Sequence, residues 1–182
     1  MKKRDIFTIP NLVTLIHLLL LPVLCFLLLN QCWFKAGFLF LFTGFLDLLD
    51  GFLAHLLKQF SELGKFLDPI VDKLGVIIVL LFLYFETGNF YYKIIFGIYL
   101  LMEFFLLGGS FYLVLKKLTG KFQVTKLGKI SMFCFFLMLT GFIFNLKIQN
   151  QITYLILFCL AVIIFFIRIF SLIKYCQNFF KK

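Results

Sequence analysis

The sequence predicts an all-α integral membrane protein with six transmembrane helices. Its 182 residues are 63% hydrophobic and have a mean hydropathy of +1.09, which is too apolar for a soluble domain. Six apolar segments reach the length of roughly 20 residues that a helix needs to cross a bilayer, and none shows the alternating pattern of a β-strand. These segments are 9–30, 35–57, 66–86, 91–115, 128–146 and 151–174.

The basic residues predict how the helices are oriented. Lysines and arginines gather at both termini and in alternate connections, whereas the other connections hold only Lys35, Lys93 and Lys147. Because cytoplasmic loops are enriched in Lys and Arg, we expect both termini and the link between the second and third helices in the cytoplasm. No small-residue cleavage site follows the basic, Leu-rich N-terminal stretch, so we expect it to be retained as the first helix. The whole chain, 1–182, is then one membrane domain.

The net charge and the cysteines narrow the range of partners. A net charge of +10 on a chain of long apolar runs favours contact with anionic membrane lipid. No soluble basic domain remains to bind nucleic acid, so no nucleic-acid partner is expected. The five cysteines lack C-x-x-C spacing and lie among apolar residues, which indicates small buried side chains rather than a disulfide or a zinc site.

Half of the eight acidic residues are aspartates of the second and third predicted helices: Asp47, Asp50, Asp68 and Asp72. Residues three or four apart share a helix face, and the short polar link lets the two pairs converge. A carboxylate near the bilayer centre costs roughly 3 kcal/mol, and two of them about 4 Å apart repel by about 4 kcal/mol. A divalent cation would offset this cost, and carboxylates with few imidazoles or thiols nearby favour Mg²⁺ or Mn²⁺. The sequence therefore predicts a metal site at these four aspartates.

The spacing around the aspartates forms a longer pattern, D-x2-D-G-x2-A-H-x8-G-x3-D-x3-D, which runs from Asp47 to Asp72. It resembles the signature of the CDP-alcohol phosphotransferase family, whose usual form has Arg at the position of His55. Every other signature position matches in type and spacing. A glycine within a helix is also common where membrane helices pack closely, but inside this signature it suggests close approach of a nucleotide. The resemblance implies that the CDP-linked lipid contacts Gly51, Ala54, His55 and Gly64.

Further stretches resemble the phosphatidylglycerophosphate synthase branch of this family. Residues 9–22, IPNLVTLIHLLLLP, resemble its first helix, where Asn11 and Thr14 match polar positions near the pyrophosphate. Residues 101–109, LMEFFLLGG, resemble its fourth helix. Residues 126–131, KLGKIS, resemble the start of its fifth helix, where basic and hydroxyl groups face the acceptor phosphate. The candidate ligands of that phosphate are Lys126, Lys129, Ser131 and Arg168.

Some of these positions have a second interpretation. Lys126 and Lys129 also fit as ordinary flanking charges of a cytoplasmic helix end. Arg168 lies inside the sixth predicted helix, where an unpaired charge is costly, so we expect it to face inward.

Three positions that usually hold Arg in the family differ in this chain, which has only two arginines. They hold His17, His55 and Met102. Arginine binds phosphate with a rigid fork of donors, whereas histidine offers two donors at most and is partly charged at neutral pH. The two histidines are therefore either partial replacements at the phosphate groups or ordinary histidines of a helix interface.

The resemblance implies transfer of a phosphatidyl group from CDP-diacylglycerol to glycerol 3-phosphate, with release of CMP. It also implies Asp72 as the general base, a homodimer, and a bacterial-type inner or plasma membrane location with the active site facing the cytoplasm. Within the family the alternative is a cardiolipin synthase that uses phosphatidylglycerol, and outside enzymes a catalytically silent, lipid-binding relative. An ion or proton pathway predicts acids across the membrane thickness, whereas these acids lie in the expected cytoplasmic half.

Overall fold

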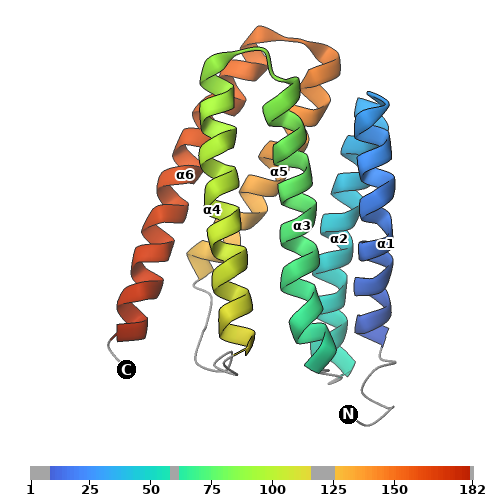
Figure 1. Cartoon of the computed structure of the whole chain (residues 1–182), viewed down its shortest axis with the longest axis vertical. Coiled ribbons are helices and arrows are strands. Elements are labelled where there is room, and N and C mark those ends of the chain that lie inside the picture. The colour runs from blue at the N-terminus through green and yellow to red at the C-terminus, as the bar shows by residue number, and fades with distance from the viewer. Residues whose placement is uncertain (1–8, 58–61, 116–125, 181–182) are drawn as a thin grey trace.

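The computed structural model describes residues 9–57, 62–115 and 126–180, and the regular structure in these ranges is all helical (Figure 1). Each predicted segment corresponds to one helix, so the all-α prediction is confirmed. The third helix begins at Glu62 rather than at 66, and the sixth continues to Phe180 rather than ending at 174, because hydropathy marks the edge of the membrane and not the end of a helix. The helices are α1 (Ile9–Leu29), α2 (Trp33–Leu57), α3 (Glu62–Glu86), α4 (Phe90–Leu115), α5 (Lys126–Ile148) and α6 (Gln151–Phe180).

Short connections join α1 to α2, α3 to α4 and α5 to α6 at one end of the bundle, which we call the capped end (Figure 1). The side chains of Asn89 and Asn150 cap α4 and α6, each accepting a hydrogen bond of 2.9 Å from a backbone N–H two residues ahead. Gln31 and Gln149 follow α1 and α5 with φ of 55°, the left-handed conformation common just past a helix C-terminus. Helix α1 begins and α6 ends at the opposite end of the bundle (Figure 1).

Helices α2 and α3 hold the bundle together. Helix α2 packs against α1 and α5, while α3 packs against α1 and α4. Two glycines let α2 approach α5, since a Cβ atom on Gly37 or Gly44 would lie 2.4 Å from the ring of Phe144 or Phe136, respectively. The rings of Phe40 and Phe136 stack in the same contact, with centroids 4.1 Å apart. Small residues at such contacts favour helix association in membranes, where tight packing replaces the hydrophobic effect.

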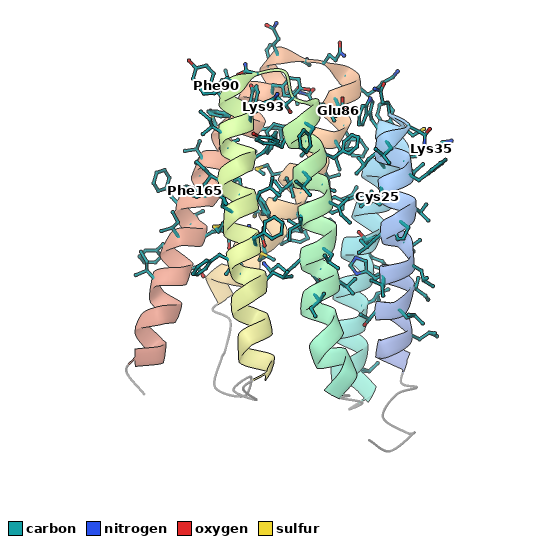
Figure 2. All side chains as sticks on the ribbon, viewed as in Figure 1. Cys25, Lys35, Glu86, Phe90, Lys93 and Phe165 are labelled. Atoms are coloured by element: carbon teal, nitrogen blue, oxygen red, sulfur yellow. The ribbon has the colours of Figure 1, made fainter. Side chains whose placement is uncertain are left out.

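Four of the described helices, α1, α4, α5 and α6, are long and apolar enough to cross a membrane. Their outward side chains are large and apolar, with Phe105 of α4 85% exposed. Figure 2 shows side chains along the bundle, with Lys35, Glu86 and Lys93 at the capped end. Four of the six predicted segments therefore have the length and the apolar composition of membrane-crossing helices.

Candidate active site

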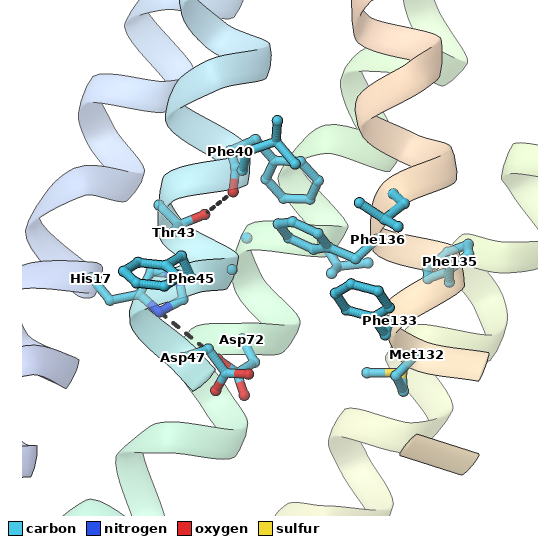
Figure 3. A pocket seen from close by; sticks show the side chains of 15 residues that line it. His17, Phe40, Thr43, Phe45, Asp47, Asp72, Met132, Phe133, Phe135 and Phe136 are labelled. Carbon is cyan, nitrogen blue, oxygen red and sulfur yellow. Dashed lines mark hydrogen bonds and ion pairs between the residues drawn. The ribbon is translucent and has the colours of Figure 1, made fainter. Parts of the chain in front are cut away.

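A cavity of about 500 Å³ lies among side chains of α1, α2, α3 and α5 (Figure 3). Its polar residues are few, and aromatic and aliphatic side chains of α2 and α5 supply most of its wall. A pocket that is largely apolar with a few polar groups is the usual form of a small-molecule site. The lining residues are His17, Phe40, Leu41, Thr43, Gly44, Phe45, Asp47, Asp72, Gly75, Val76, Met132, Phe133, Phe135, Phe136 and Leu137.

Two of the four predicted aspartates line this cavity from different helices. Asp47 reaches it from α2 and Asp72 from α3, although 24 residues of sequence separate them. Each is only partly buried, so neither carboxylate is sealed into the helix packing. The structure therefore brings Asp47 and Asp72 to the same cavity.

His17 of α1 is a third polar group at the cavity. Its side chain is buried, and its Nδ1 atom lies 3.8 Å from Oδ1 of Asp72, which is longer than a hydrogen bond. Within the described residues Nδ1 has no hydrogen-bond partner. Gly75 of α3 faces α1 here, since a Cβ atom on it would lie 3.3 Å from the Leu21 side chain and 4.0 Å, an ordinary contact distance, from Nε2 of His17. A buried polar atom without a protein partner is uncommon, and a ligand in the cavity is one explanation for it.

The apolar wall of the cavity reaches the lipid-facing surface of the bundle. Phe45 on α2 and Phe133 and Leu137 on α5 line the cavity and are also exposed on the outside. A chain of methylene groups can therefore lie against this wall while a polar head reaches Asp47 and Asp72. These residues could not be identified from the sequence, since a phenylalanine that lines a cavity looks like any other in a chain with 29 of them.

Arg168 faces into the bundle, as predicted, and belongs to an ion network that the sequence does not reveal. Its Nη2 atom lies 2.5 Å from Oε1 of Glu103 and donates a hydrogen bond of 2.9 Å to the sulfur of Met132. Its guanidinium lies 4.4 Å from the centre of the Phe135 ring. Lys73 donates a hydrogen bond of 2.6 Å to Oε2 of the same Glu103. Glu103 thus joins two cations, one from α3 and one from α6.

The other predicted site residues divide into two groups. Thr14 and Ser131 are buried, and the Ser131 hydroxyl donates a hydrogen bond of 2.9 Å to the backbone carbonyl of Gly128. The side chains at the remaining positions lie outside the part of the chain whose side chains are described. Those positions are Asn11, Asp50, Gly51, Ala54, His55, Gly64, Asp68, Lys126 and Lys129.

The predicted metal site can therefore be compared with the structure only at Asp47 and Asp72. Among the described residues no group of three or more His, Cys, Asp or Glu side chains could hold a metal ion. Two carboxylates at one cavity fit a hard divalent cation, because Mg²⁺ and Mn²⁺ prefer oxygen ligands.

Comparisons with known proteins agree with the signature. The family model for CDP-alcohol phosphatidyltransferase matches residues 7–169. A Pseudomonas fluorescens protein named CDP-diacylglycerol–glycerol-3-phosphate 3-phosphatidyltransferase is 43% identical over 84 residues, which are 44% of this chain and 43% of that protein. A Haemophilus influenzae protein of the same name is 29% identical over 174 residues, or 94% of this chain and 92% of that protein.

A Schizosaccharomyces pombe protein named cardiolipin synthase (CMP-forming) / mitochondrial hydrolase fusion protein is 39% identical over 71 residues. The match covers 39% of this chain and 12% of that protein. The chain thus spans less than half the length of two of these relatives and nearly all of the Haemophilus protein. Because the family model covers most of the sequence, the chain belongs to the CDP-alcohol phosphatidyltransferase family.

Proposed function

We propose that the protein transfers a phosphatidyl group from CDP-diacylglycerol to glycerol 3-phosphate, forming phosphatidylglycerophosphate and CMP. The observation that carries this proposal is the cavity at which Asp47 and Asp72 meet an apolar wall open to lipid. A substrate with a charged pyrophosphate and two acyl chains needs both surfaces in one place. The names of the Pseudomonas and Haemophilus relatives support glycerol 3-phosphate as the acceptor.

The lipid substrate would lie across the two surfaces of the cavity. Its acyl chains pack against the phenylalanines of α2 and α5, and its cytidine and pyrophosphate approach the aspartates. His17 has a buried nitrogen without a partner among the described residues, which supports a contact with the pyrophosphate. The family signature adds Asn11, Thr14, Gly51, Ala54, His55 and Gly64 as contacts of the CDP-linked lipid.

The aspartates would hold a divalent cation, Mg²⁺ or Mn²⁺, because hard oxygen ligands favour these ions. Asp47, Asp50, Asp68 and Asp72 are the proposed ligands, and the hard carboxylate oxygens at the cavity support them. When bound, the metal neutralises the pyrophosphate and stabilises the CMP leaving group.

Asp72 would act as general base on the acceptor. It takes the proton from a hydroxyl of glycerol 3-phosphate, whose oxygen then attacks the phosphorus that bears diacylglycerol. The bond from this phosphorus to the bridging oxygen breaks, and CMP leaves with that oxygen. Positioning of the two substrates accounts for much of the rate in such a displacement. Lys126, Lys129, Ser131 and Arg168 are the proposed ligands of the acceptor phosphate.

We extend the proposal to the membrane arrangement. Helices α2 and α3 have 25 residues each and pack among the four helices that can cross a membrane, which supports six spans in one domain. The lysine distribution supports a cytoplasmic position for both termini and for the active site. A homodimer in an inner or plasma membrane follows from the family resemblance alone.

The test is CMP release by the purified protein from radiolabelled CDP-diacylglycerol with Mg²⁺ or Mn²⁺. Glycerol 3-phosphate, phosphatidylglycerol and inositol are supplied in turn as the acceptor. CMP release with glycerol 3-phosphate alone supports the proposal. Release with phosphatidylglycerol alone supports the second candidate, a cardiolipin synthase, which the Schizosaccharomyces relative favours. No release with any acceptor would show a catalytically silent relative.

A further inference from the structure

Glu103 is the most completely buried charged group that the structure describes. Its side chain is 0% exposed, although its neighbours on α4, Leu101, Phe104 and Phe105, are all exposed. A carboxylate within a membrane-spanning helix is costly and usually functional. It is retained where cations compensate it, and removal of one partner from such a group is strongly destabilising.

Two cations compensate Glu103, and each connects it to a part of the proposed site. Lys73, at 2.6 Å, directly follows Asp72 along α3. Arg168, at 2.5 Å, comes from α6 and contacts Met132 and Phe135, which form part of the cavity wall. Glu103 itself does not line the cavity, so it can act on the reaction only through these two neighbours.

We propose that Glu103 is a positioning residue that holds the segment bearing Asp72 and the side chain of Arg168 at a fixed separation. This inference rests on the proposed function, in which Asp72 is the base and Arg168 binds the acceptor phosphate. Helix α4 packs against both α3 and α6, so a carboxylate on α4 can reach a cation on each side. Oε2 of the carboxylate accepts a hydrogen bond from Lys73, and Oε1 lies in an ion pair with Nη2 of Arg168 that lacks hydrogen-bond geometry, so one carboxylate contacts both cations at once.

The contributions of the two cations in the Lys73–Glu103–Arg168 network can be tested separately. If Lys73 is removed, Glu103 and Arg168 remain as a neutral pair, so Arg168 keeps its anchor. If the charge of Glu103 is removed, both cations lose the carboxylate with which they form ion pairs. The two changes should therefore differ in their effect on the acceptor, because only the second releases Arg168.

Tyr99 provides a matched control. It lies one helical turn before Glu103 on the same helix and is equally buried. Its hydroxyl donates a hydrogen bond of 2.7 Å to the backbone carbonyl of Ala161, so it also connects α4 to α6. Tyr99→Phe removes this connection without changing any charge. It reports what a purely structural contact between the two helices contributes.

The experiment measures kcat and both KM values for the purified wild type and for four variants in detergent. Glu103→Gln should lower kcat by about 100-fold and raise KM for glycerol 3-phosphate, because small displacements of reacting groups cost this much. Glu103→Asp keeps the charge but is one methylene shorter, so it should lower kcat by about tenfold. Lys73→Met should lower kcat and leave KM for glycerol 3-phosphate unchanged. Tyr99→Phe should match the wild type, and KM for CDP-diacylglycerol should stay constant throughout.

Several results would overturn the inference. If Glu103→Gln, Glu103→Asp and Tyr99→Phe behave alike in kcat and both KM values, Glu103 is a structural contact only. Full activity of Glu103→Asp would show that its reach is irrelevant. If Glu103→Gln does not fold, the kcat of Lys73→Met is the deciding measurement: a lowered kcat supports the inference, and an unchanged kcat overturns it. An active wild type with unaffected variants overturns this inference alone, whereas a wild type that releases no CMP removes the proposed function and this inference together.

Discussion

Buried polar groups differ between the capped end of the bundle and the surroundings of the cavity. At the capped end the polar groups are satisfied: Thr87 donates a hydrogen bond of 2.7 Å to the Leu83 carbonyl, and Asn145 and Asn150 bond each other through side chain and backbone. At the cavity, Nδ1 of His17 has no hydrogen-bond partner within the described residues, and neither do Nη1 of Arg168 and Oε1 of Glu103 in the neighbouring ion network. Unsatisfied buried groups cost about 1–3 kcal/mol each.

The apolar packing differs in the same way. At the capped end Phe142 is fully buried among aromatic rings, with centroids 5.0 Å from Phe96, 6.2 Å from Tyr92 and 6.3 Å from Tyr154. At the cavity, phenylalanines of α2 and α5 surround about 500 Å³ that the protein does not fill. The capped end therefore provides stability, whereas the cavity region gives up stability to keep a site open.

The largest expected effect is the loss of activity in Asp72→Asn, a change at the cavity. This change removes the proposed base and should lower CMP release by about 1,000-fold, within the usual range for a general base. The fold should survive, because an amide costs less than a carboxylate inside a membrane protein. The measurement is the initial rate of CMP release with saturating CDP-diacylglycerol. Normal turnover in this variant would remove the base assignment.

Phe142→Ala, at the capped end, should lower stability and leave activity unchanged. Loss of a fully buried ring should lower the free energy of unfolding by about 3 kcal/mol. The folded fraction should keep its normal specific activity, because Phe142 does not line the cavity. Thermal unfolding in detergent measures the loss of stability. Phe105→Ala is the matched control. The Phe105 side chain is 85% exposed, so its loss should leave the midpoint of thermal unfolding unchanged.

A large part of this arrangement could be predicted from the sequence. Helices in a membrane follow directly from apolar runs, and the signature spacing placed Asp47 and Asp72 on adjacent helix faces. Both do line one cavity. Arg168 was expected to face inward because a charge in lipid is costly, and it does.

The partners of these residues could not be predicted. Lys73 and Glu103 are 30 residues apart, and the sequence alone does not show which faces of α3, α4 and α6 meet. In the sequence Glu103 is one acid among apolar residues, and no local spacing connects it to Lys73 or Arg168. The aromatic wall was missed for the same reason. Long-range side-chain pairing depends on helix rotation and packing, which leave little trace in a uniformly apolar sequence.

Gly37 and Gly44 of α2 each lie against a phenylalanine ring of α5, but only the ring beside Gly44 lines the cavity. A Cβ atom at Gly44 would lie 2.4 Å from Phe136, which lines the cavity, and one at Gly37 would lie 2.4 Å from Phe144, which does not. Either alanine variant should cost about 1–3 kcal/mol of stability through overpacking. Only Gly44→Ala should push a ring into the cavity, and it should raise KM for CDP-diacylglycerol by about tenfold. Equal KM values in the two variants would show that the lipid does not use this wall.

The smallest expected effect is that of His17→Gln. Nδ1 of His17 lies too far from Asp72 for a hydrogen bond, so its loss should leave proton removal by Asp72 intact. Loss of a hydrogen bond from His17 to the pyrophosphate, worth about 1 kcal/mol, would instead raise KM for CDP-diacylglycerol by about fivefold at unchanged kcat. Initial rates at varied CDP-diacylglycerol separate the two parameters. A fall in kcat at constant KM would assign His17 to the orientation of Asp72, and a change in stability alone would make it an ordinary histidine of the α1–α3 interface.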